Sequence, residues 1–171
     1  MGIPQRRLPR MILYDVPREC PEQQILTCMK KQNQDRLKEE DIAAIKFCFR
    51  TGPKDSEETN WVMEVSLQVR EKLLMGKVQV SWSTCKVRDY IATSRCYKCQ
   101  AYGHVAKYCR VNYEICVESG HSTRTCTNKE KNNSCVNCRK AGMKGDHAAY
   151  NVNSPMYKKA LEAVVSRTQY E

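Results

Sequence analysis

The stretch Cys96-Tyr-Lys-Cys-Gln-Ala-Tyr-Gly-His-Val-Ala-Lys-Tyr-Cys109 decides how the second half of this chain folds. Its spacing is Cys-x2-Cys-x4-His-x4-Cys, which places four soft ligands within fourteen residues. A segment this short cannot bury a hydrophobic core, so its structure has to come from a metal ion. Thiolates and an imidazole in this number are typical of tetrahedral Zn²⁺. The sequence therefore predicts a zinc site formed by Cys96, Cys99, His104 and Cys109.

The predicted zinc site has all four positions filled by protein side chains, so it leaves no position for a catalytic water. A closed site of this kind is structural. The sequence also contains neither the His-Glu-x-x-His motif of metalloproteases nor the His-x-Glu and Pro-Cys-x-x-Cys pair of zinc deaminases. We therefore expect a protein that is not an enzyme and has no small-molecule substrate.

The charge of the chain is unevenly distributed. The 171 residues include 29 Lys and Arg and 19 Asp and Glu, which gives a net charge of +10. Residues 1–91 contribute +3 and residues 92–171 contribute +7. The positive charge is therefore concentrated in the cysteine-rich half, where it favours a polyanionic partner such as nucleic acid.

The eleven cysteines are interpreted as reduced thiols rather than as disulfides. The N-terminal segment 1–10 is charged but is not followed by an apolar run as long as that of a signal peptide. No segment is long and apolar enough to span a bilayer. We expect a protein of the cytosol, the nucleus or both, without membrane association.

Residues 10–91 contain the only stretch able to form an ordinary core, and their pattern predicts an α+β domain. Apolar runs and alternations indicate four strands, and two helical segments lie between them. The expected strands contain residues 11–14, residues 45–49, residues 60–65 and residues 78–82, and the expected helices span 21–29 and 66–75. Inward-facing residues in the later strands are expected to include Phe47 and Phe49, Trp61 and Met63, and Val80 and Trp82.

The resulting order, β-α-β-β-α-β, resembles the ferredoxin-like arrangement shared by RNA-recognition motifs. Binding of RNA by this domain does not follow, because the third strand, 60–66, lacks the aromatic signature of such motifs. Tyr14 is either a stacking residue or a buried tyrosine.

Two further Cys/His groups follow the first. At an offset of 17 residues, Cys116, His121 and Cys126 repeat three of the four ligands, and Tyr113 replaces the first cysteine. Residues 94–127 are therefore predicted to be a zinc-knuckle region with one intact and one incomplete unit.

The third group lies in residues 133–154 and is also incomplete. Cys135, Cys138 and His147 supply three ligands, and Ser154 stands where a fourth cysteine is expected. Ser154 and Pro155 together are a typical helix start, and they predict a C-terminal helix over 155–170. Three alternatives are open for the incomplete groups. Each group binds zinc weakly, with water or another side chain as the fourth ligand; or the two groups pool their ligands across 127–134 into one site; or neither group binds a metal. We favour partial or lost binding over pooling, because pooling requires the linker to fold back.

The residues between the ligands of the first group are candidates for contacts with nucleic acid. Tyr97 follows the first cysteine and Val105 follows the histidine, which allows an aromatic and an aliphatic side chain to face outward. Stacking of an unpaired base on such a ring contributes about 1–3 kcal/mol. Phosphates can be contacted by Lys98, Lys107 and Arg110.

The segment 96–110 resembles the zinc knuckles of retroviral nucleocapsid proteins. It is still more similar to those of the Gag-like first-frame proteins of arthropod-type LINE retrotransposons. The similarity extends over most of residues 10–165, and its other segments are 12–17, 49–52, 60–65, 85–89, 134–138, 147–150 and 155–158. The missing ligands and the short N-terminal region depart from the family and indicate a truncated or degenerate copy, or a fragment retained by a host.

This resemblance implies a protein that coats element RNA, self-associates into ribonucleoprotein particles and assists annealing of nucleic acids during reverse transcription. Its partner would be single-stranded RNA or DNA, and its cofactor Zn²⁺. The alternative is a protein-interaction module in which the α+β domain and the C-terminal helix bind a protein partner. In that alternative the knuckle is an accessory structural element.

Overall fold

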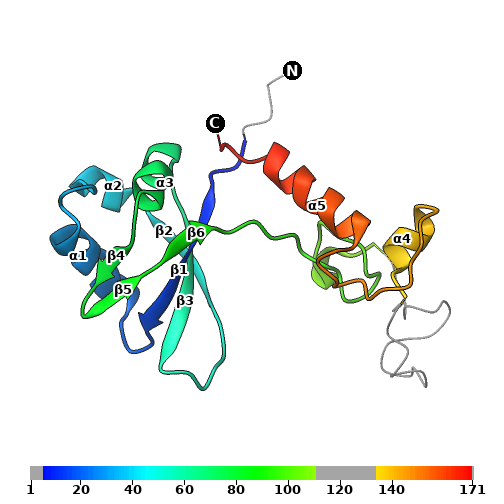
Figure 1. The fold of residues 1–171 in the computed structure, drawn as a ribbon, viewed down its shortest axis with the longest axis horizontal. Helices are drawn as coiled ribbons and strands as arrows, with labels where there is room; N and C mark the ends of the chain where they lie inside the picture. Colours follow the sequence, from blue (N-terminus) through cyan, green and yellow to red (C-terminus); the bar gives the residue numbers. More distant parts are fainter. Residues whose placement is uncertain (1–5, 111–133, 171) are drawn as a thin grey trace. The chain divides into compact units, whose positions relative to one another are not determined.

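The computed structural model of the chain describes residues 6–110 and 134–170 (Figure 1). They form two compact units. Unit 1 contains the residues up to Ile91 together with the C-terminal residues from Arg167, and unit 2 is Ala92–Ser166. None of the helices in these described ranges is long and apolar enough to cross a membrane.

Unit 1 is built on a four-stranded antiparallel sheet with the strand order β2-β3-β1-β6. Its strands are β1 (Arg10–Pro17), β2 (Lys46–Thr51), β3 (Glu58–Glu64) and β6 (Val87–Asp89). The helices on one side of this sheet are α1 (Glu22–Gln32), α2 (Glu39–Ala43) and α3 (Leu67–Leu74) (Figure 1). A separate hairpin consists of β4 (Val78–Val80) and β5 (Ser83–Cys85). The predicted α+β class is confirmed.

The core of unit 1 lies between the helices and one face of the sheet. The expected inward-facing residues of β3 are confirmed, because Trp61 and Met63 both belong to this core, whereas Val62 between them is buried but lies outside this core cluster. Leu13 of β1 pairs with Trp61 on one side and with Val87 on the other, so the apolar side chains of three strands lie on the same face. Ser66 caps α3 as its sequence indicates, and its hydroxyl accepts a hydrogen bond from the Val69 N–H at 3.3 Å.

The prediction that Phe49 shares the buried face of Phe47 is wrong. The pairing of β2 with β3 shifts between these two residues, and the shift inserts one residue, Cys48, into the ladder. Such a bulge reverses the alternation of the side chains that follow it. Phe47 therefore reaches the core, while Phe49 is 40% exposed and packs edge-on against Tyr90 at 5.9 Å.

The prediction that residues 78–82 supply the last strand of the main sheet is also wrong. Val78 and Val80 are buried in the core, but the chain turns at Ser81, whose φ of 57° lies in the left-handed region. Trp82 follows in this tight turn and is 99% exposed. The edge strand beside β1 is supplied by β6 instead. With α2 added as well, the order of elements differs from the predicted β-α-β-β-α-β at two places.

Unit 2 contains the short helices η1 (Ala106–Tyr108) and α4 (Val136–Lys140) and the longer α5 (Pro155–Ser166). The C-terminal helix was expected to continue to residue 170, but α5 ends at Ser166. The backbone after it pairs with Arg7: the Arg7 N–H donates to the Arg167 carbonyl at 2.9 Å, and the Gln169 N–H donates to the Arg7 carbonyl at 2.8 Å. These backbone groups are therefore used in a β-bridge rather than in a helix.

We predict that Asp41 stabilises unit 1 at neutral pH but not in acid. Burial raises the pKa of this carboxyl group, but hydrogen bonds from the Lys72 side chain at 2.6 Å and the Lys38 N–H at 2.8 Å outweigh burial and lower the pKa. Because the folded-state pKa is depressed, the contribution is present above the ordinary value of 3.8 and is lost as the pH falls through the folded-state value. Asp41→Asn should lower the free energy of unfolding at pH 7 by about 2 kcal/mol.

Urea denaturation at pH 7 and near pH 3 measures this effect. The difference between Asp41→Asn and the original chain should shrink at the lower pH. The matched control is Glu40→Gln, because Glu40 is an exposed neighbour in α2. An Asp41→Asn effect of equal size at both pH values would contradict the assignment.

Candidate metal centres

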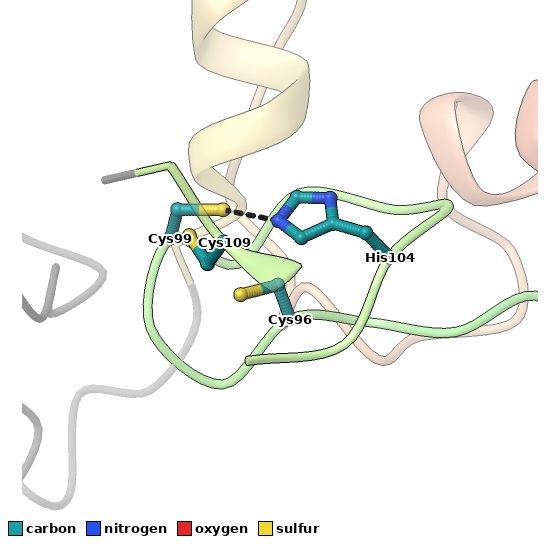
Figure 2. Close-up of side chains that lie close together, drawn as sticks. All are labelled: Cys96, Cys99, His104 and Cys109. Carbon is teal, nitrogen blue, oxygen red and sulfur yellow. Dashed lines mark hydrogen bonds between the residues drawn. The ribbon is translucent and has the colours of Figure 1, made fainter. Parts of the chain in front are cut away.

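The first Cys/His group forms one compact cluster. The ligand atoms of Cys96, Cys99, His104 and Cys109 lie within 4.8 Å of one another. Figure 2 shows the three sulfur atoms and the imidazole pointing toward a common centre. The Cys99 Sγ and the His104 Nε2 are 3.4 Å apart. All three cysteines are free thiols, so the cluster is not held by a disulfide.

Backbone hydrogen bonds shape the loop that carries these ligands. The Gln100 N–H donates to the Cys96 carbonyl at 2.8 Å, and the Cys96 N–H donates to the Ala101 carbonyl at 2.8 Å. Gly103 then reverses the chain with a φ of 93°, a conformation that favours glycine. This turn lies directly before His104 and directs it back toward the first two cysteines. The single turn of η1 returns the chain to Cys109.

The geometry of the first cluster fits a tetrahedral metal ion. With metal–sulfur bonds of about 2.3 Å and metal–nitrogen bonds of about 2.0 Å, neighbouring sulfur and nitrogen ligands lie roughly 3.6 Å apart. The 3.4 Å between Cys99 and His104 is close to that separation. Cys96 and Cys99 are buried, whereas His104 and Cys109 are partly exposed. These four residues can therefore hold one metal ion near the surface of unit 2.

One thiol of the first cluster ionises readily. Burial raises the pKa of Cys96, but hydrogen bonds from the backbone N–H groups of Cys99 and Lys98 and from the neighbouring thiols lower that pKa to about 7. In contrast, burial raises the pKa of Cys99. The thiolate is the form of cysteine that binds metals. The cluster therefore favours the thiolate form of Cys96, and the positive charge of a metal ion would favour the other thiolates.

The second described cluster consists of Cys135, Cys138 and His147, whose ligand atoms also lie within 4.8 Å of one another. Cys135 precedes α4 and Cys138 lies within it. The Cys138 Sγ is 3.4 Å from the His147 Nε2, the same separation as in the first cluster. The Cys135 N–H donates to the Gly145 carbonyl at 2.7 Å, and a Cβ atom at Gly145 would lie only 2.9 Å from the Cys135 carbonyl oxygen. Glycine thus permits the close approach that joins the two ends of this cluster.

Ser154 occupies the fourth side of the second cluster. Its side chain is nearly inaccessible, with 1% of the residue exposed. The Ser154 Oγ lies 3.3 Å from the Cys138 Sγ and 3.8 Å from the Cys135 Sγ. Burial raises the pKa of Cys138, but the hydrogen bond with Ser154 and others from Met156 and Cys135 lower it. A neutral hydroxyl is a weak ligand for zinc, so three strong ligands and one weak group face the centre of this cluster.

Ser154 also performs the role that its sequence context predicts. Its hydroxyl accepts a hydrogen bond from the Tyr157 N–H at 3.4 Å, and α5 begins at the next residue, Pro155. The cap position explains why the hydroxyl is fixed beside the two cysteines. The sequence indicated the cap, and only the structure places the same oxygen atom against the sulfur atoms.

The two clusters are joined within unit 2 by polar and aromatic contacts. The Asn137 Nδ2 donates to the Gln100 carbonyl at 2.8 Å. The Tyr102 hydroxyl donates to the Ala149 carbonyl, and the Tyr102 ring packs edge-on against Tyr157 at 5.7 Å. These contacts join segments that the sequence pattern divides into separate regions, 94–127, 133–154 and 155–170.

The remaining predicted site residues fall into two groups. Cys116, His121 and Cys126 lie outside the described residues. The five candidate contacts for nucleic acid all lie at least partly at the surface: Tyr97, Lys98, Val105, Lys107 and Arg110. Tyr97 is 74% exposed and Val105 is 44% exposed.

Fold and site together define a mixed α+β protein that carries groups of Cys and His side chains able to hold metal ions. Over 164 residues, the chain is 25% identical to the "Uncharacterized 50 kDa protein in type I retrotransposable element R1DM" of Drosophila melanogaster. The match covers 93% of this chain and 34% of that protein, so the chain spans about a third of its relative's length. The similarity links the chain to proteins of retrotransposons. No protein-family model and no solved structure matches the chain.

Proposed function

We propose that this chain binds single-stranded RNA in a zinc-dependent manner, as a Gag-like, nucleocapsid-like ribonucleoprotein component of a retrotransposon. The observation that carries this proposal is the first cluster, in which four ligands converge while Tyr97 and Val105 beside them stay exposed. Four protein ligands are typical of structural zinc, which when bound would fix the shape of the loop. The similarity to the uncharacterized R1 element protein supports the retrotransposon part of this proposal.

In this proposal each exposed residue of the loop has a distinct task. The Tyr97 ring offers a face on which an unpaired base stacks, and Val105 adds an apolar contact beside it. Lys98, Lys107 and Arg110 contact phosphates, so that affinity depends on salt. Single-stranded DNA presents the same bases and phosphates and would bind at the same surface. The protein binds and self-associates on the strand without catalysing a reaction.

Unit 1 would serve as an assembly domain with an RNA-recognition-like fold. Its sheet order, β2-β3-β1-β6, is that of a ferredoxin-like domain if α2 and the β4–β5 hairpin are regarded as insertions. This comparison supports a fold related to RNA-recognition motifs, with β6 as the fourth strand.

A second candidate function is a protein-interaction module. It is favoured by Trp82, which is almost fully exposed at the tip of the β4–β5 hairpin, and by Met75, which is exposed at the end of α3. A large exposed aromatic side chain such as that of Trp82 is of the kind that anchors contacts with protein partners. In this candidate function the metal clusters only support the fold.

The test is fluorescence anisotropy of a labelled single-stranded RNA with the full chain, in zinc and in excess chelator. We expect chelation to weaken binding roughly 5- to 150-fold, because loss of one stacked base removes about 1–3 kcal/mol. With three phosphate contacts, the slope of log affinity against log salt should be about −2. An RNA affinity that is the same with zinc and with chelator, or no RNA binding at all, would contradict the proposal and favour the protein-interaction alternative.

A further inference from the structure

Arg95 brings together two exposed tyrosines from the two metal clusters. Its guanidinium carbon lies 5.6 Å from the centre of the Tyr97 ring and 5.7 Å from the centre of the Tyr150 ring. Tyr97 belongs to the first cluster, and Tyr150 comes three residues after His147 of the second. Tyr150 is 65% exposed, nearly as much as Tyr97. Neither Arg95 nor Tyr150 was among the residues predicted from the sequence.

The backbone and side chains beneath this arrangement are fixed. The buried Gln100 accepts a hydrogen bond from Arg95 at 2.5 Å through its side-chain oxygen, and its side-chain nitrogen donates to the Tyr97 carbonyl at 3.1 Å. On the other side, the Tyr102 hydroxyl binds the carbonyl of Ala149, the residue before Tyr150. The rings are therefore exposed, but the groups that carry them are held in place before any ligand binds.

We propose that Tyr97, Arg95 and Tyr150 form one composite surface for single-stranded nucleic acid that spans both clusters. This inference rests on the proposed function and extends its contact surface to the second cluster. Two exposed rings and a guanidinium plane offer stacking faces to unpaired bases, and the guanidinium also attracts phosphate. The charge of +7 on residues 92–171 makes a polyanion, rather than a protein surface of mixed charge, the matching partner.

The composite surface gives the second cluster a role that does not require it to contact nucleic acid through its ligands. Cys135, Cys138 and His147 would fix the segment that carries Tyr150. Asn137, through its bond to the Gln100 carbonyl, would keep that segment beside the first cluster. The strand would then contact one ring from each cluster at the same time.

The test compares Tyr150 variants of the full chain in the RNA anisotropy assay with zinc. Tyr150→Leu keeps an apolar side chain but lacks a flat ring, so its affinity should fall roughly tenfold, as expected for one stacked base. Tyr150→Phe retains the ring and should bind like the original chain. Trp82→Leu removes an even more exposed aromatic, from unit 1, and should leave RNA affinity unchanged. Zinc content should be the same in all variants, because neither residue is a ligand.

The outcomes separate this inference from the proposed function. If the original chain binds RNA with zinc but Tyr150→Leu binds equally well, the composite surface is refuted and the proposed function stands. If the original chain does not bind, both fail. If Tyr150→Leu loses zinc, Tyr150 is needed for the fold of the second cluster, and that variant no longer reports on stacking alone. The inference is then tested with Arg95→Gln. That variant should retain zinc and weaken binding several-fold, and unchanged affinity would refute the inference.

Discussion

Ser154→Cys is expected to raise the zinc affinity of the second cluster by at least about 100-fold, since a full set of four ligands contributes roughly 10–16 kcal/mol. The substitution places a sulfur atom where the Ser154 hydroxyl now lies, 3.3 Å from the Cys138 Sγ and 3.8 Å from the Cys135 Sγ. Sulfur ligands of a tetrahedral zinc are separated by roughly 3.8 Å. The change therefore completes a site whose other three ligands already converge.

Competition with a coloured zinc chelator measures the change in affinity, and the absorption of bound Co²⁺ reports the number of sulfur ligands. Ser154→Ala is the matched control, because both variants weaken the cap of α5 but only the cysteine adds a ligand. We expect Ser154→Ala to leave the zinc affinity unchanged or slightly lower. Equal affinities for the two variants would show that the fourth position of this cluster is not at Ser154.

The first cluster could be predicted in full from the sequence, whereas the second could be predicted only in part. Cys96 and Cys109 are separated by thirteen positions along the chain, and short turns alone bring the ligands together. The second cluster also requires α4, the Gly145 turn and the start of α5 to meet. The group on its fourth side is the hydroxyl of Ser154, the cap of α5. The spacing of residues in the sequence does not indicate the direction in which this hydroxyl points.

The sheet shows where pattern reasoning failed. The pattern of Trp61 and Met63 correctly placed β3, because both register shifts along this central strand put the extra residue in the partner strand, so β3 itself keeps a period of two. Phe49 and Trp82 were predicted to be buried but are exposed. The bulge in β2 turns Phe49 to the other face of the sheet, and the tight turn at Ser81 places Trp82 outside the strand. A bulge is set by pairing with a partner strand, so the sequence of β2 alone does not reveal it.

The composite surface was missed for a related reason. Gln100 and Asn137 are polar residues in loops or short helices, and such residues usually face water. Here Gln100 is buried and connects Arg95, Tyr97 and Asn137 through hydrogen bonds. These contacts join segments far apart in the chain, so only the folded structure brings Tyr150 beside the first cluster.

Cys99→Ser is expected to abolish zinc binding by the first cluster and to weaken RNA binding roughly 5- to 150-fold, the effect of losing one stacked base. Among the described residues of segment 94–110, the buried ones are Cys96, Cys99 and Gln100, and they cannot form a core without a metal ion. Losing one ligand should therefore release the loop that carries Tyr97. Zinc stoichiometry and RNA anisotropy on the full chain measure the two effects.

The control for this variant is Cys48→Ser, which changes an exposed cysteine of β2 and should leave both measurements unaffected. Fluorescence of the buried Trp61 during urea denaturation should show that unit 1 unfolds as before in both variants. Lys98, Lys107 and Arg110 remain in Cys99→Ser, so the residual affinity should keep its salt dependence and lose its response to chelator. Retention of zinc-dependent binding would contradict the role of the first cluster. If Cys99→Ser loses the response to chelator but keeps the salt slope, the ordered Tyr97 ring and the charged side chains make separate contributions to RNA affinity.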